Sequence, residues 1–127
     1  MAIIKRLPDT EFELMRVIWR HAPPVTTTEI IQALGESNNR KPQTVLTMLV
    51  RLIEKGYLLS ERVGKERNYT PIISEDEYMS IETGEFISRY RGKSVGSLVK
   101  TMYEGKDLSN EDLNELKKWL NEKGGKV

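Results

Sequence analysis

Polar side chains recur on one side of residues 41–55 in this 127-residue chain. Gln43, Thr47 and Arg51 follow one another at intervals of four, so an α-helix would stack them on one face. Amide, hydroxyl and guanidinium groups can hydrogen-bond to base edges, and a threonine methyl can contact that of thymine. A helix that presents such groups from its first turns is typical of major-groove recognition. The segment predicts a DNA-reading surface made of five side chains: Lys41, Gln43, Thr44, Thr47 and Arg51.

The other side of this segment is expected to lie in a hydrophobic core. Four residues give it an apolar stripe (Val45, Leu46, Leu49 and Leu52), and Met48 is assigned to the polar side. An ordinary amphipathic helix with a solvated face has the same pattern, so this segment leaves both interpretations open. The elements on either side of it favour the DNA-reading one.

The first 73 residues predict three helices followed by a β-hairpin. The expected elements are a helix over 10–21 capped by Asp9, a two-turn helix from the Thr26–Glu29 capping box to Gly35, a third over 42–55, and strands 57–63 and 67–71 around a Gly64-Lys65 turn. This order is that of a winged helix-turn-helix domain. Lys65 and Arg67 are expected to contact phosphates or the minor groove, and Tyr57 and Tyr69 to be buried.

Residues 74–127 change to an all-helical pattern. Ser74 with Glu77 opens one predicted helix, a second covers 94–103, and Ser109 caps a third. Three such helices bury too little apolar surface to be stable alone, so we expect them to pack against a second copy, with Trp119 near that interface. The predicted fold is mainly α: a winged-helix DNA-binding domain (1–73) and a small three-helix dimerisation domain (74–127).

Composition excludes several classes of protein. There is no cysteine and one histidine, so we expect no metal site, no cofactor and no enzyme of the Ser-His-Asp or thiol type. No apolar run approaches the roughly 20 residues of a membrane span, and the N-terminus lacks a signal peptide, which predicts a cytoplasmic protein. Residues 40–67 carry seven Lys or Arg and three Asp or Glu, although the whole chain has a net charge of only +1. A locally basic stretch suits a phosphate-facing surface, and equally an ordinary solvated one.

Three motifs resemble the BlaI/MecI penicillinase repressors. They are the opening Pro8–Trp19 (PDTEFELMRVIW), the predicted third helix Lys41–Gly56 (KPQTVLTMLVRLIEKG), and the C-terminal pair Val95–Val99 (VGSLV) and Asp107–Ser109 (DLS). The resemblance implies a homodimer that binds a palindromic operator in double-stranded DNA and represses β-lactamase or other antibiotic-resistance genes. It assigns the major-groove role to the five residues named above and the wing role to Lys65 and Arg67. Copper-responsive relatives carry a cysteine-rich tail, which this chain lacks.

Two positions depart from the pattern of that family. Its helix-capping serine is replaced by Lys41, which loses a cap and adds a possible phosphate contact. Antibiotic-responsive members are cut by a partner sensor protease in the membrane at an Asn-Phe bond, and the matching pair here is Thr101-Met102. The inducing signal is therefore expected to differ, while the hydrophobic Met102 keeps this bond a candidate cleavage site. Two alternatives to a repressor of this type are an effector-binding winged-helix regulator and a winged-helix protein-interaction module that does not bind DNA.

Overall fold

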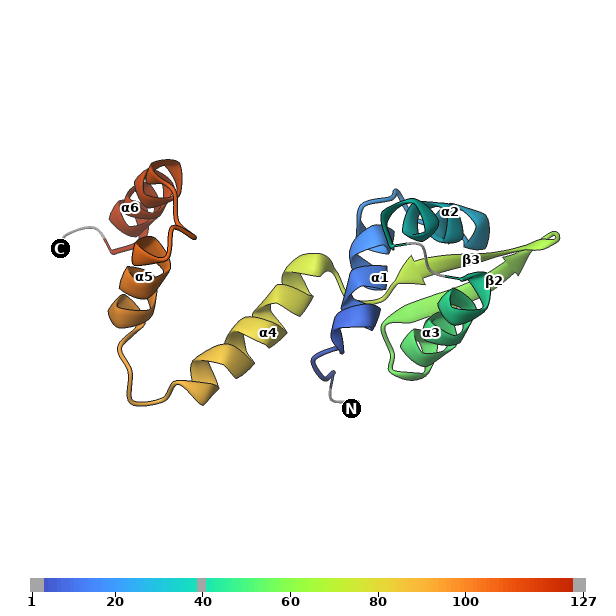
Figure 1. The fold of residues 1–127 in the computed structure, drawn as a ribbon, viewed down its shortest axis with the longest axis horizontal. Helices are drawn as coiled ribbons and strands as arrows, with labels where there is room; N and C mark the ends of the chain where they lie inside the picture. Colours follow the sequence, from blue (N-terminus) through green and yellow to red (C-terminus); the bar gives the residue numbers. More distant parts are fainter. Residues whose placement is uncertain (1–3, 39–40, 125–127) are drawn as a thin grey trace. The chain divides into compact units, whose positions relative to one another are not determined.

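The computed structural model describes residues 4–38 and 41–124, and the chain divides into two compact units, the first ending at Phe86 and the second beginning at Ile87 (Figure 1). The elements, in chain order, are α1 (Asp9–Trp19), β1 (Val25–Thr26), α2 (Thr27–Asn38), α3 (Pro42–Glu54), β2 (Leu58–Val63), β3 (Glu66–Pro71), α4 (Glu75–Arg89), α5 (Val95–Glu104) and α6 (Asn110–Gly124). The first six form a winged helix-turn-helix, as predicted: three helices packed against a small sheet whose hairpin extends beyond them (Figure 1). The predicted fold class is confirmed.

The sheet has the strand order β1-β3-β2, and all its pairs are antiparallel. The hairpin was predicted from alternation and from the turn at Gly64-Lys65, where Gly64 adopts φ +65°, a conformation that favours glycine. The register places Leu58 opposite Pro71 and Arg62 opposite Arg67. The third strand, β1, was not predicted, because two residues are too few to show alternation; Val25 pairs with Tyr69.

One hydrophobic core joins the helices to the sheet. Its buried members come from every element of the winged helix, and Tyr57 and Tyr69 are among them, as predicted. The first turn of α4 contributes Tyr78, which is stacked on Phe12 and accepts a hydrogen bond from the backbone N–H of Leu7 at 2.6 Å. Burial raises the pKa of Tyr57 to about 12 and also raises the pKa of Tyr78, so both hydroxyls stay neutral.

Two of the predicted capping boxes form, whereas the predicted N-cap of α1 does not. Thr26 with Glu29 and Ser74 with Glu77 exchange the expected hydrogen bonds, and these bonds lower the pKa of both carboxylates. Asp9 is inside α1 rather than its cap, because Pro8 takes the N-cap position and no side chain caps it.

Helix α2 is longer than the predicted two turns. Gly35 lies within it and does not adopt the left-handed conformation in which a glycine commonly ends a helix. The loop predicted at 36–39 is therefore helical through Asn38, and Asn39 lies outside the described residues. The first compact unit also extends past the predicted boundary at 73/74 to Phe86, because Tyr78 belongs to its core.

The second unit consists of the end of α4 and the helices α5 and α6. Ser94 caps α5, and Ser109 with Asp112 forms a capping box at the start of α6 that lowers the pKa of Asp112. No described residue beyond Tyr78 is buried, although Val95, Met102, Trp119 and Leu120 are large apolar side chains. None of the described helices is long and apolar enough to cross a membrane.

Candidate nucleic-acid interface

Helix α3 presents a different apolar stripe from the one expected. Its buried residues are Val45, Met48, Leu49 and Leu52, whereas Leu46 is 38% exposed. The predictions for Met48 and Leu46 were therefore wrong. The buried set has the spacing i, i+3, i+4, i+7 of a helix face directed at a core, and position 46 falls outside that arc.

The five predicted DNA-reading residues are all exposed and lie on the outward side of α3. Gln43 and Thr47 occupy consecutive turns on one row, and Thr44 and Arg51 share a row beside it. The Thr47 hydroxyl donates to the Gln43 carbonyl at 3.1 Å, so its oxygen remains available as an acceptor. Lys41 is the N-cap residue, in extended conformation, with no side-chain hydrogen bond to the first turn.

The hairpin directs two arginines toward α3. Arg67 donates from Nη1 to Ser60 Oγ at 3.0 Å, and Arg62 donates from Nε to the Gly64 carbonyl at 3.4 Å. Neither guanidinium forms an ion pair among the residues whose side chains the structure describes. Arg67 was predicted and Arg62 was missed, because only the turn was considered. Side chains alternate between the two faces of a strand, and the predicted hairpin pairs Arg62 with Arg67, so both lie on the same face. This pattern could have identified Arg62.

Hydrogen bonds to α2 anchor the hairpin. Thr27 Oγ1 donates to the Arg67 carbonyl at 3.2 Å, and the Thr28 backbone N–H donates to Glu66 Oε1 at 3.2 Å. A carboxylate at a helix N-terminus is stabilised by the helix dipole. Glu66 is thus bound to α2, and Lys65 stands at the exposed turn.

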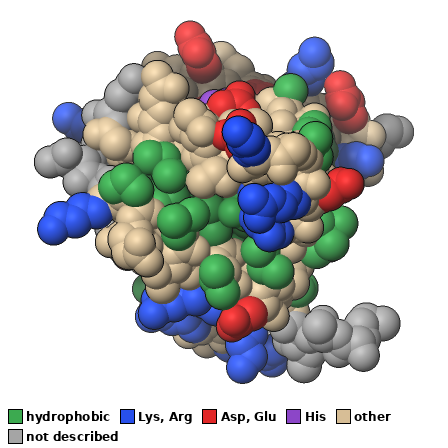
Figure 2. All heavy atoms as spheres, turned by 90° about the vertical axis from the view of Figure 1, so that its right-hand side faces the viewer, with side chains coloured by type: hydrophobic (Ala, Val, Ile, Leu, Met, Phe, Trp, Pro, Cys, Tyr) green, Lys and Arg blue, Asp and Glu red, His purple; other side chains and the backbone are tan. Residues whose placement is uncertain are grey.

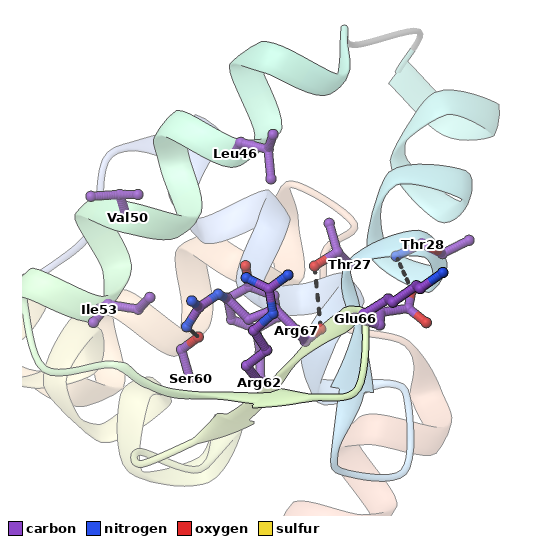
Figure 3. A pocket seen from close by; sticks show the side chains of 11 residues that line it. Thr27, Thr28, Leu46, Val50, Ile53, Ser60, Arg62, Glu66 and Arg67 are labelled. Carbon is purple, nitrogen blue, oxygen red and sulfur yellow. Dashed lines mark hydrogen bonds between the residues drawn. The ribbon is translucent and has the colours of Figure 1, made fainter.

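A groove of about 740 Å³ runs between α3 and the hairpin (Figure 3). One wall is an apolar row from α3, Leu46, Val50 and Ile53, and the other includes Arg62 and Arg67. Figure 2 shows hydrophobic side chains gathered in the middle of this side of the molecule, with Lys and Arg next to them. The groove is therefore apolar along one side and positively charged along the other.

The basic count from the sequence overstates the charge of this surface. Lys55 Nζ lies 2.5 Å from Glu11 Oε1, and the Glu11 side chain is only 5% exposed. This ion pair links α1 to the end of α3, so Lys55 is a structural residue.

In the described part of the chain, no three His, Asp or Glu residues lie close enough together to hold a metal ion.

The candidate cleavage bond, Thr101-Met102, lies in the last turn of α5 and not in a loop. Both residues are exposed, and Thr101 Oγ1 donates to the Ser97 carbonyl at 3.0 Å. The Thr101 carbonyl accepts from Gly105 N and the Met102 carbonyl from Asp107 N, each at 2.9 Å. A protease that binds extended substrate must therefore first open this turn.

Comparison with known proteins shows what this arrangement is similar to. The penicillinase repressor family model matches residues 7–122. The penicillinase repressor of Bacillus licheniformis is 37% identical over 122 residues, 96% of this chain and 94% of that one. The methicillin resistance regulatory protein MecI of Staphylococcus aureus is 26% identical over 92% of this chain and 94% of its own. The solution structure of the monomeric form of B. licheniformis BlaI in complex with the blaP half-operator is 41% identical, with a TM-score of 0.52, over 61% of this chain and 94% of that chain.

Proposed function

Because the chain belongs to the penicillinase repressor family of DNA-binding transcriptional repressors, we propose that it controls a β-lactamase or another antibiotic-resistance gene through an operator that α3 reads. The family is not one of enzymes. Membership agrees with the resemblance of the sequence motifs and favours DNA binding over the protein-interaction alternative. A relative named for methicillin resistance supports a target of the antibiotic-resistance kind.

Within this proposal, the exposed polar rows of α3 read the operator. Gln43 and Thr47 face bases in the major groove, with Thr44 and Arg51 beside them and Lys41 on a phosphate. The Thr47 hydroxyl, whose proton is already donated to the Gln43 carbonyl, accepts from a base amino group, and the Thr47 methyl contacts a thymine methyl. Lys65 and Arg67 contact the DNA backbone from the hairpin. The exposure of all these side chains on one domain supports the assignment.

The second unit is the dimerisation domain in this proposal. Its helices carry apolar side chains at helical spacing and bury none of them in one protomer, which supports a second copy as their partner. A dimer places two α3 helices about one DNA turn apart, roughly 34 Å, so the operator is palindromic. The protein is proposed to act on operator DNA and therefore to be cytoplasmic.

Removal of the dimer contacts would release the operator, since two linked half-sites would no longer bind as one ligand. A membrane sensor protease that cuts at Thr101-Met102 would achieve this, once the last turn of α5 has opened. Incubation with the cognate sensor and fragment mapping by mass tests the step. Absence of a cut between residues 101 and 102 removes the protease from the proposal and leaves repression intact.

The observation that carries the proposal is the exposed Gln43–Thr47 row on α3 of a repressor-family winged helix. Its test is a titration of the purified protein against DNA from upstream of its own gene and against a scrambled duplex. We expect a footprint with dyad symmetry and preferential binding to the first duplex. Gln43→Ala should lose that preference and keep its affinity for scrambled DNA. Equal binding of the wild-type protein to both duplexes would overturn the proposal.

A further inference from the structure

The segment that joins α4 to α5, residues 90–94, is exposed and lies among basic residues (Figure 1). Arg89 ends α4, and Arg91 and Lys93 follow it at intervals of two. Residues 86–103 contain no Asp or Glu that could neutralise them. None of these three cations forms an ion pair among the residues whose side chains the structure describes. The segment is therefore suited to bind an acidic surface.

Ser94 comes directly after these cations and is the N-cap residue of α5. Its backbone is extended, with φ −73° and ψ 148°, and Gly92, with φ +95°, places a turn two residues before it. The Ser94 hydroxyl oxygen accepts a hydrogen bond from the Ser97 backbone N–H at 3.0 Å. This bond occupies one of the two lone pairs of Oγ, so the exposed hydroxyl can still act as a nucleophile. An exposed serine with arginines five and three residues before it has the charge pattern of a substrate of arginine-directed protein kinases.

We propose that Ser94 is the phosphorylation site of a serine/threonine protein kinase that selects arginine upstream of its acceptor. Acidic side chains of the kinase bind Arg89 and Arg91, and its catalytic aspartate takes the proton of Ser94 Oγ. The oxygen attacks the γ-phosphorus of Mg-ATP, the bond from that phosphorus to the β,γ-bridging oxygen breaks, and phosphoserine and ADP result. The modification goes beyond the proposed function and does not depend on DNA binding.

Two other hydroxyl side chains show why both the cations and the exposed turn are needed. Thr70 also has an arginine three residues before it, Arg67, but it lies within β3 and is paired with β2. A kinase that binds extended substrate would have to break this pairing. Ser74 is an exposed helix-opening serine like Ser94, but no Lys or Arg occurs in the five residues before it. The turn and the upstream arginines come together at Ser94.

A phosphate on Ser94 would alter the start of α5. The first turn of this helix contains no acidic residue, so the added anion meets no carboxylate there. Phosphoserine carries a charge of about −1.5 to −2 at pH 7, which lowers the net charge of residues 89–94 from +3 to about +1. Its oxygens can accept from the Ser97 N–H and pair with Arg91. We therefore expect the backbone amides of Ser97 and Leu98 to exchange hydrogen about two- to fivefold more slowly after phosphorylation.

The acceptor is tested on the full-length protein with Mg-ATP and the catalytic subunit of cyclic-AMP-dependent protein kinase, an arginine-directed enzyme. Peptide mapping by mass should place the phosphate on Ser94 and none on Ser74. Arg91→Gln keeps the hydroxyl and the helix cap, and it should slow phosphorylation at least about tenfold. Lys118→Gln, which removes an exposed cation from α6, is the matched control and should leave the rate unchanged. Ser94→Ala should abolish the reaction, but it also removes the cap of α5, so Arg91→Gln decides the role of the cations.

The same mapping on protein isolated from the cells that produce it, in exponential and in stationary growth, tests whether the site is used. Phosphate on Ser94 in either sample supports the inference, and its absence from both overturns it, even if the added kinase modifies the purified protein. Equal rates for the wild-type protein and Arg91→Gln would show that the cations do not recruit the kinase and would also overturn it. Unchanged amide exchange at Ser97 and Leu98 after phosphorylation would refute the expected effect on α5. None of these measurements uses DNA, so their outcome is separate from that of the operator titration.

Discussion

The ion pair between Glu11 and Lys55 predicts an asymmetric response to removal of its two partners. The Glu11 side chain is 5% exposed and that of Lys55 41%, with 2.5 Å between Oε1 and Nζ. Loss of the lysine leaves a carboxylate that cannot reach water, whereas loss of the carboxylate leaves an ammonium group that can. We therefore expect Lys55→Met to be clearly more destabilising than Glu11→Gln.

The magnitudes follow from this difference in burial. Breaking a fully buried ion pair from one side costs about 3–5 kcal/mol, and the exposure of Lys55 reduces the value here to about 2–3 kcal/mol for Lys55→Met. The position of Glu11 in the first turn of α1 offsets a further part, since the helix dipole stabilises an anion there. Glu11→Gln keeps an acceptor and leaves no buried charge, so its cost is that of one hydrogen bond, about 0.5–1.5 kcal/mol.

The assay is urea unfolding of both single variants and of the double variant. Because the double variant contains no buried charge, it should be more stable than Lys55→Met alone. Arg6→Gln is the matched control: its 3.8 Å pair with Glu82 is more exposed and should be worth less than about 0.5 kcal/mol. Equal destabilisation by the two single variants, or a double variant that loses the sum of both, would refute the reasoning from burial.

Three further predictions concern other parts of the fold. Tyr78→Phe leaves the buried N–H of Leu7 without its acceptor and should cost about 1–3 kcal/mol in urea unfolding; a smaller change would mean that water replaces the hydroxyl. The hydrogen bonds from Ser74 lower the pKa of Glu77, so their stabilisation is complete above about pH 4.5 and is lost as the pH falls through the folded-state pKa. Acid titration of stability should therefore be less steep for Glu77→Gln, and identical curves would contradict this. Trp119→Glu should shift the protein toward monomer in sedimentation experiments without lowering the stability of the winged helix, and an unchanged dimer would place the interface elsewhere.

Local signals were sufficient to predict most elements of this chain. The capping box at Thr26, the proline at the start of α3 and the Gly64-Lys65 turn each satisfy a backbone requirement within a few residues, so the sequence predicts them directly. Gly35 shows where this fails. Its position after an apolar helical pattern predicts the end of a helix, but α2 continues through Asn38.

The composition of the α3 surface could be predicted only in part. A single helix has apolar residues at 45, 46, 48, 49, 50, 52 and 53, which is more than one face can hold. Which of them meet the core depends on how α3 is rotated against α1 and the sheet, and that rotation is fixed by tertiary packing. The sequence therefore predicted the polar rows correctly and exchanged Met48 with Leu46. Arg62 was missed for a related reason, since its role depends on which face of the hairpin turns toward α3.

The division of the chain into two units means that DNA reading and the proposed dimerisation belong to different units. One winged helix presents few base-reading side chains, and each good base contact is worth about 1–3 kcal/mol. If the second unit joins two protomers, as proposed, occupancy of the operator depends on the linkage as strongly as on any contact to DNA. A signal can then release the gene by acting on α5 or α6 alone, with the DNA-reading surface unchanged. The bond at Thr101-Met102 has this property: it lies in the second unit, whereas the described residues that form or pack against the winged-helix core end at Ile81.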